Sequence, residues 1–208
     1  MEAVVPYEQR LKASFPWALR EGSMHFEHES GVQKTLAQIA KRLSALGVPY
    51  AVVGGLALFY HGYRRFTEDV DILVTRESLK LIHEKLEGLG YLPPFEGSKN
   101  LRDTDTGVRI EFLVTGDFPG DGLPKPVSFP DPSSVSVEIE GFQFLSLHAL
   151  VELKLASGIS NPRRGKDLID IQELISTLNL GDDFAEQLNP YVQEKFHELV
   201  RVIRDNPE

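Results

Sequence analysis

Three acidic residues on two short apolar segments are the groups in this sequence best suited to chemistry. In residues 69–74, Asp69 and Asp71 alternate with valine and isoleucine. Successive side chains of a strand point to opposite faces, so both carboxylates are predicted to project from one face. Carboxylates this close repel each other unless a proton or a cation lies between them. Hard oxygen ligands of this kind suit Mg2+ shared with substrate phosphates.

A third carboxylate follows from the same alternation. In residues 108–114, the apolar residues alternate with Arg109, Glu111 and Leu113, which predicts a second strand with Glu111 on its polar face. If this strand pairs beside residues 69–74, Glu111 joins Asp69 and Asp71. The sequence leaves the register of that pairing open.

A glycine pair precedes the acidic strand. Gly54 and Gly55 stand between residues 50–53, which predict a short buried strand, and residues 56–60, which have helical spacing. Glycines let the backbone approach a ligand closely, and a helix start presents unpaired N–H groups to an anion. The pair therefore predicts a phosphate-binding turn beside a metal site.

This order of motifs resembles the nucleotidyltransferase fold shared with DNA polymerase β and the aminoglycoside nucleotidyltransferases. Within the minimal bacterial branch, the sequence is most similar to the AbiEii-type toxin nucleotidyltransferases of type IV toxin–antitoxin systems. Their Arg-x-Thr/Ser-x-Asp-x-Asp block is matched by Arg65, Thr67, Asp69 and Asp71. Their later helical motif, a Lys and then Arg and Lys/Arg-Asp-x-x-Asp, is matched by residues 147–155 followed by Arg163, Lys166, Asp167 and Asp170. The likeness covers residues 32–176.

The resemblance implies roles for these residues. Asp69 and Asp71 would hold Mg2+ or Mn2+ bridging a nucleoside triphosphate (NTP), and Glu111 would complete the metal site and help to deprotonate the acceptor. The implied nucleotide-binding residues are Gly54, Gly55, Arg65, Thr67 and Lys154. Further candidates for substrate contact or orientation are Arg64, Arg163, Lys166, Asp167 and Asp170.

Two residues depart from the family pattern. Leu56 stands where Thr or Ser usually follows the glycine pair, so phosphate binding would rest on backbone groups alone. The third acid is Glu111 rather than the Asp common in polymerase-like members, which lengthens the reach to a metal by one methylene.

Each motif also has a plain structural interpretation. The glycine pair could be only a tight turn, and the two aspartates an exposed acidic face. Lys154 and the residues 163–166 could be solvated helix residues, and Asp167 and Asp170 could pair only with basic neighbours. His61 more simply matches the polarity of a helix C-terminus. The order and spacing of the acids favour an active site.

Composition places the chain among ordinary globular proteins. Of its 208 residues, 41% are hydrophobic and 25% are charged. It has no apolar run long enough for a membrane span and no cysteine, which excludes disulfides and fits a cytoplasmic location. A net charge of −9 argues against broad nonspecific binding to nucleic acid but leaves room for a local basic groove.

We expect an α+β fold, with a mixed sheet flanked by helices. The predicted units are an N-terminal arm (1–31), irregular or a short helix, a nucleotidyltransferase core (32–145) and a C-terminal helical subdomain (146–208). One predicted helix starts at residue 32 and ends before Gly47. Four more are predicted over residues 79–89, 147–157, 166–178 and 191–203. Residues 135–144 predict a hairpin, 100–105 an edge strand or turn, and 115–134 a long loop that could cover the site.

The predicted function is Mg2+-dependent transfer of a nucleoside monophosphate (NMP) from an NTP to a hydroxyl or phosphate-bearing acceptor. Since no compact small-molecule pocket can be read from the sequence, a macromolecular acceptor is preferred, tRNA before protein. A toxin-like role implies a cognate antitoxin as partner. The alternative is a non-catalytic module with the same fold, serving as an antitoxin or nucleotide sensor.

Overall fold

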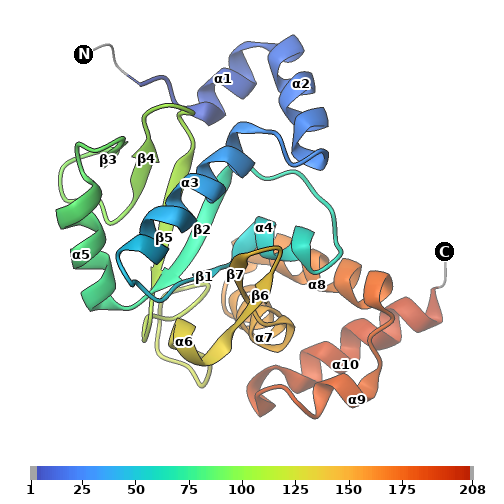
Figure 1. The fold of residues 1–208 in the computed structure, drawn as a ribbon. Coiled ribbons are helices and arrows are strands. Elements are labelled where there is room, and N and C mark those ends of the chain that lie inside the picture. The colour runs from blue at the N-terminus through green and yellow to red at the C-terminus, as the bar shows by residue number, and fades with distance from the viewer. Residues whose placement is uncertain (1–3, 207–208) are drawn as a thin grey trace.

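Strands from distant parts of the chain form one seven-stranded mixed sheet in the computed structural model, which describes residues 4–206 (Figure 1). The strand order is β3-β4-β5-β2-β1-β7-β6. Strands β2 and β5 pair in parallel, as do β1 and β7, and the other neighbours are antiparallel. The strands are β1 Ala51–Val52, β2 Asp69–Val74, β3 Tyr91–Leu92, β4 Leu101–Asp103, β5 Arg109–Val114, β6 Ser136–Ile139 and β7 Phe142–Leu145. The expected α+β class is confirmed.

The centre of the sheet is the parallel pair β2–β5. Its register sets Asp69 opposite Arg109, and Asp71 opposite Glu111. The residues on the other face of these strands, among them Ile72 and Phe112, are fully buried. The pairing that the alternation left open is therefore confirmed, and it brings the three acids to one face.

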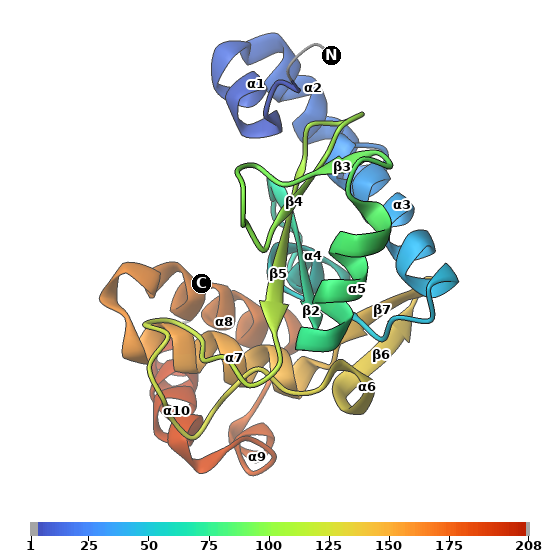
Figure 2. The same ribbon diagram turned by 90° about the vertical axis from the view of Figure 1, so that its left-hand side faces the viewer.

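Two amphipathic helices lie on the apolar side of this pair. Helix α3 (Gly31–Ala45) is capped by Ser30, whose side chain accepts from the Gln33 N–H, and α5 (Arg76–Leu86) is capped in the same way by Thr75. Figure 2 shows both helices on the same side of β2 and β5. Helix α5 begins and ends three residues earlier than predicted, because Thr75 provides the cap.

The chain between β1 and β2 forms the short helix α4 (Gly54–Tyr60). The Val53 N–H donates to the Asp71 carbonyl, so the glycine turn begins directly beside the acidic strand. The predicted sequence of strand, glycine pair, short helix and acidic strand is confirmed.

The C-terminal part of the chain is helical, as expected. It contains α7 (Leu147–Ser160), a 3-10 turn (Pro162–Arg164), α8 (Gly165–Leu178), α9 (Asp182–Ala185) and α10 (Pro190–Asp205). The short helix α9 was not predicted. The β6–β7 hairpin is confirmed, and the long loop before it ends in one helical turn, α6 (Pro132–Val135).

The N-terminal segment differs from the prediction. Instead of an irregular arm or one short helix, residues 7–26 form α1 (Tyr7–Ala13) and α2 (Phe15–Phe26), while residues 1–3 lie outside the described part. Ser14 caps α2 and Pro16 occupies its first turn, where proline is tolerated. The buried Tyr7 hydroxyl donates to Glu21 Oε2 over 2.9 Å. This long-range contact, which local patterns do not reveal, fixes the helix pair.

Two smaller findings complete the fold. Strand β4 is not the edge of the sheet, because β3 pairs outside it. Within residues 4–206, no helix combines the length and apolar character needed to cross a membrane.

The close approach of α7 and α8 depends on Gly158. A Cβ atom there would lie 2.5 Å from Leu168 Cδ2. We expect Gly158→Ala to lower the free energy of unfolding by about 1–3 kcal/mol through overpacking, measured by urea denaturation.

The matched control is Gly22→Ala in α2, where an added Cβ meets no atom within 4 Å. This change should raise stability by about 0.5–1 kcal/mol through helix propensity. Equal stabilisation by both changes would contradict the close packing of α7 on α8.

Candidate active site

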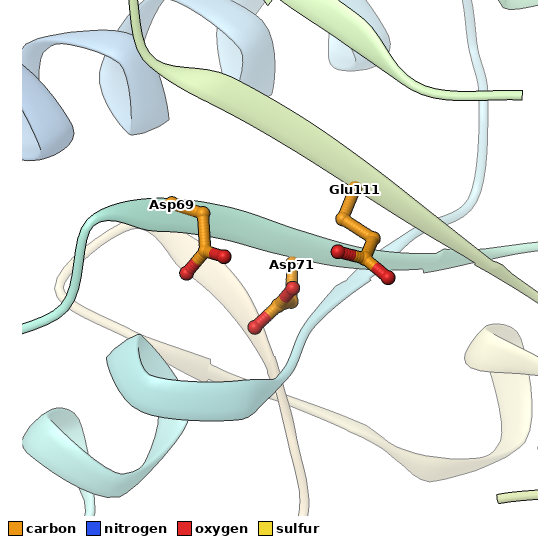
Figure 3. Close-up of side chains that lie close together, drawn as sticks. All are labelled: Asp69, Asp71 and Glu111. Carbon is orange, nitrogen blue, oxygen red and sulfur yellow. The ribbon is translucent and has the colours of Figure 1, made fainter. Parts of the chain in front are cut away.

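Asp69 and Asp71 of β2 and Glu111 of β5 form one acidic cluster (Figure 3). One carboxylate oxygen from each residue lies within 4.8 Å of the other two. All three side chains are partly exposed. The cluster follows directly from the parallel register of the two strands, and Figure 3 shows its members projecting from the same side of them.

Arg109 partly neutralises this cluster. Its Nη2 lies 2.9 Å from Asp69 Oδ2 and 3.1 Å from Glu111 Oε2. One guanidinium cannot balance three carboxylates, and Asp71 is left without a cation in direct contact among the described ion pairs. Burial, together with the charges of Asp69 and Glu111, raises the pKa of Asp71 from 3.8 to about 8.

The donor set fits a divalent cation. Three carboxylates converge, and burial together with the charges of Asp69 and Glu111 raises the pKa of Asp71, so its protonated form is favoured over a wider pH range. A metal ion would replace that proton, and oxygen ligands of this kind are those that Mg2+ and Mn2+ accept. Asp69, Asp71 and Glu111 are the residues that would hold it.

The glycine turn meets the acids at distances that no side chain allows. Gly54 has a φ of +64°, and a Cβ there would lie 1.9 Å from Asp71 Oδ2. A Cβ on Gly55 would lie 2.7 Å from Thr67 Oγ1 and 3.3 Å from Arg65 Nη1. The missing side chains therefore let Asp71, Thr67 and Arg65 lie directly against the backbone of the turn, and both glycines line the cavity. Leu56 is buried in the core, so it offers nothing to a ligand.

Thr67 orients the first acid. Its hydroxyl donates to Asp69 Oδ1 over 3.0 Å, and its side chain is buried. The residue predicted to bind nucleotide thus contacts a candidate metal ligand. Its contact with a nucleotide stays a prediction.

Lys154 lies at the centre of a buried charge network. Its Nζ donates to Asp167 Oδ1 over 2.9 Å and to Asp170 Oδ2 over 2.7 Å. Ser157 also donates to Asp167, over 2.7 Å. Burial raises the pKa of Asp167, but Lys154 and these hydrogen bonds outweigh it and hold that pKa below its usual value.

The same network reaches the segment that leads into the acidic strand. Arg65 Nε lies 3.0 Å from Asp170 Oδ1, and the Arg65 guanidinium also borders Gly55. Asp170 of α8 therefore fixes an arginine beside the glycine turn. Lys154 and Arg65 compensate Asp167 and Asp170, and the more exposed Arg164 adds a third cation beside Asp167. The buried charges of the network are therefore paired.

The remaining predicted residues separate into two groups. Arg163, Arg164 and Lys166 line the cavity, with Arg164 Nε 2.9 Å from Asp167 Oδ2. Arg64 does not line the cavity. Its guanidinium lies 5.8 Å from the centre of the Phe59 ring.

His61 has a structural role, in line with the plainer interpretation. It is the C-cap residue of α4, and its Nε2 lies 2.7 Å from the Leu145 carbonyl. Burial lowers the pKa of His61, and Nε2 is the donor in this contact because a carbonyl oxygen only accepts.

A cavity of about 890 Å³ connects these groups. The glycine turn, the acids, Lys154 and the loop after β5 all line it, together with Lys99 and Phe118. Sequence patterns missed the last two because they lie in irregular segments. The alternation that found Glu111 could also have identified Arg109. This cavity removes the sequence-based reason for preferring a macromolecular acceptor.

The raised pKa of Asp71 makes the stability of the metal-free protein depend on pH. Between about pH 4 and 8 the folded state holds a proton that the unfolded state has released, so this group's contribution to the free energy of unfolding falls as pH rises. We expect the free energy of unfolding of wild type to fall relative to that of Asp71→Asn from about pH 5.5 to 8. Urea denaturation with EDTA measures it.

Comparison with the variant matters because His25, which is buried, and His61, which is partly buried, have lowered pKa values and contribute a pH dependence of stability with the opposite slope. Adding Mn2+ should stabilise wild type more at the higher pH and leave Asp71→Asn almost unchanged. A pH-independent difference would show that Asp71 is not the proton-binding group.

No family model matches this sequence, and no curated protein matches it. Among solved structures, the chain is similar to the solution structure of the antibiotic-resistance factor ANT(2")-Ia, at 16% identity and a TM-score of 0.54, covering 84% of this chain and 98% of that one. It is also similar to the crystal structure of ANT(2")-Ia in complex with adenylyl-2"-tobramycin, at 14% identity and a TM-score of 0.50, covering 83% and 96%.

A third neighbour is a nucleotidyltransferase-like protein from Paracoccidioides brasiliensis, at 16% identity and a TM-score of 0.49, covering 84% and 88%. These neighbours do not single out the AbiEii-type branch, so that subtype stays a prediction. Identities this low establish architecture alone, and the architecture of this chain is the nucleotidyltransferase fold.

Proposed function

We propose that this chain is a metal-dependent nucleotidyltransferase that moves an NMP from an NTP to an acceptor and releases pyrophosphate. The observation that carries the proposal is the convergence of Asp69, Asp71 and Glu111 on one face of β2–β5, opening into a cavity of about 890 Å³. The nucleotidyltransferase fold supports the same class of reaction by analogy.

Mg2+, with Mn2+ as the alternative, is the proposed cofactor. When bound, it would neutralise charge on the reacting phosphate and lower the pKa of an oxygen nucleophile. Asp69, Asp71 and Glu111 would supply its protein ligands. Glu111 is also suited to accept the proton of the acceptor hydroxyl, since it is a partly exposed carboxylate that lines the cavity.

The chain's own cations and backbone would position the triphosphate. Gly54 and Gly55 line the cavity, where their backbone could contact phosphate, and Arg65 lies beside Gly55, held by Asp170. Thr67 keeps Asp69 in place. The same cavity is lined by three more cations, Lys99, Arg163 and Lys166. These side chains can form ion pairs with the phosphates.

The proposed acceptor carries a hydroxyl or a phosphate. Cations that line the cavity favour an anionic acceptor such as a tRNA end, with a protein side chain as the second choice. A toxin-like role in the cytoplasm, with a cognate antitoxin, belongs to the same proposal and rests on two sequence motifs, the block from Arg65 to Asp71 and the later helical motif that ends at Asp170. The similar crystal structure of ANT(2")-Ia contains adenylyl-2"-tobramycin, an adenylylated small molecule.

One observation favours a second candidate function. Arg109 contacts both Asp69 and Glu111, and a guanidinium in this position competes with a metal ion for the same oxygens. In a non-catalytic nucleotide sensor or antitoxin with this fold, Arg109 would be the permanent counter-ion. Such a module would bind nucleotide without a metal and transfer nothing.

Transfer can be measured directly with each α-labelled NTP, Mg2+ and either total tRNA or a cell lysate, resolved on denaturing gels. Wild type should label an acceptor. Asp71→Ala should reduce the label at least about 100-fold, equivalent to about 3 kcal/mol of lost transition-state stabilisation. The matched control is Glu138→Ala, an exposed carboxylate on β6, which should label like wild type.

If wild type and Glu138→Ala label an acceptor and Asp71→Ala does not, the result would support transfer. It would also identify the base and the class of acceptor. Equal label from Asp71→Ala would contradict the proposed role of the acidic cluster. Folded wild type that labels nothing, yet binds NTP without Mg2+, would favour the sensor with Arg109 as counter-ion.

A further inference from the structure

An aromatic side chain stands in the cavity wall without a partner in the hydrophobic core. Phe118, in the loop that follows β5, is partly exposed and lines the same cavity as the three acids. Within residues 4–206, it is absent from the aromatic pairs and from the side chains packed on the core. The Nζ of Lys125 lies 5.8 Å from the centre of its ring.

The loop that carries Phe118 is fixed against α7. Gly120 has a φ of +78°, and a Cβ there would lie 2.7 Å from the Ser157 carbonyl. Asn161 Nδ2 donates to the Gly120 carbonyl over 3.2 Å, and Lys125 Nζ donates to the Pro119 carbonyl over 2.7 Å. Figure 2 shows this yellow-green loop running beside α7. The backbone next to the ring is therefore held in place before any ligand arrives, which lowers the entropic cost of binding.

The cavity that Phe118 shares with the acids also has apolar lining residues. Leu113 lies two residues beyond Glu111 on the same face of β5, roughly 6–7 Å further along the strand. Phe129, Leu150 and Leu153 line the same cavity. The acids therefore suit metal and phosphates, and the apolar residues Leu113, Phe129, Leu150 and Leu153 (the apolar strip) suit a flat, weakly polar group.

We propose that Phe118 is a stacking platform for a nucleobase, with Leu113 and Phe129 as its apolar surroundings. This proposal rests on the nucleotidyl transfer proposed above and identifies the part of the ligand that occupies the apolar strip. A nucleobase can come from two sources, the NTP or the terminal nucleotide of a nucleic-acid acceptor. The chemistry of recognition is the same for both, because every base presents a π-face to an aromatic ring.

Stacking also predicts that Phe118 recognises different bases about equally well. A ring contacts the face of a base and not its hydrogen-bonding edge, so the contribution of Phe118 should be similar for purines and pyrimidines.

The test uses the full chain with Ca2+ in place of Mg2+, which limits turnover. Affinities are measured by calorimetry for inorganic tripolyphosphate, for the four NTPs, and for a short single-stranded RNA with and without its 3′-terminal base. The variants are Phe118→Ala, Phe118→Leu, which keeps an apolar side chain of similar size, and Phe118→Trp, which keeps an aromatic ring.

If the NTP supplies the base, Phe118→Ala and Phe118→Leu should weaken all four NTPs roughly 5- to 100-fold and leave tripolyphosphate unchanged, while Phe118→Trp retains NTP affinity. If the acceptor supplies it, NTP affinities should stay constant and only the RNA that ends in a base should lose affinity.

The aromatic variant also gives a spectroscopic check, since Trp17 is the one tryptophan of the chain. When Phe118→Trp is combined with Trp17→Phe, the introduced indole is the sole source of tryptophan fluorescence. Base stacking should quench that fluorescence, and tripolyphosphate should not.

The proposal is overturned if Phe118→Leu binds every NTP and both RNAs as wild type does. That result, together with intact tripolyphosphate binding and NMP transfer, would leave the proposed function standing. Wild type that binds neither tripolyphosphate nor NTP and transfers nothing would overturn both proposals.

Discussion

Electrostatic repulsion among Asp69, Asp71 and Glu111 is the constraint on which the rest of this structure depends. Parallel pairing of β2 with β5 forces the three carboxylates onto one face. The buried opposite face fixes that register, because a one-residue slip would move the acids into the core. Packing energy of the sheet thus maintains a cluster that would otherwise separate, and Arg109 offsets only part of the repulsion. The raised pKa of Asp71 reflects its burial and the repulsion that Arg109 leaves uncompensated.

The second element of the site is the buried network around Lys154. It connects α7 and α8 to Arg65, and Arg65 lies against the glycine turn. The helical part of the chain thereby forms the wall of the cavity that faces the acids. Buried charge pairs of this kind contribute little net stability but are costly to break. They are therefore well suited to setting the position of one structural unit relative to another.

Period-two alternation was sufficient to predict the strands that carry the acids. It identified Asp69, Asp71 and Glu111, and the glycine pair located the turn beside them. The same reasoning could not find Tyr7 bonded to Glu21, because that contact joins segments that local periodicity does not describe. Two other features also depend on tertiary contacts. They are the pairing of Lys154 with two aspartates and the position of the loop after β5 in the cavity wall. Helical spacing predicted α7 but not the partners of its buried lysine.

The most direct test of the central claim is a crystal structure with Mn2+ and a non-hydrolysable NTP analogue, with anomalous scattering used to locate the metal. We expect Mn2+ bound by Asp69, Asp71 and Glu111, with Arg109 displaced from at least one of its two carboxylates and the phosphates beside the glycine turn. An anomalous map without a peak at the three acids, with Arg109 still bridging Asp69 and Glu111 while the nucleotide is bound, would contradict that claim.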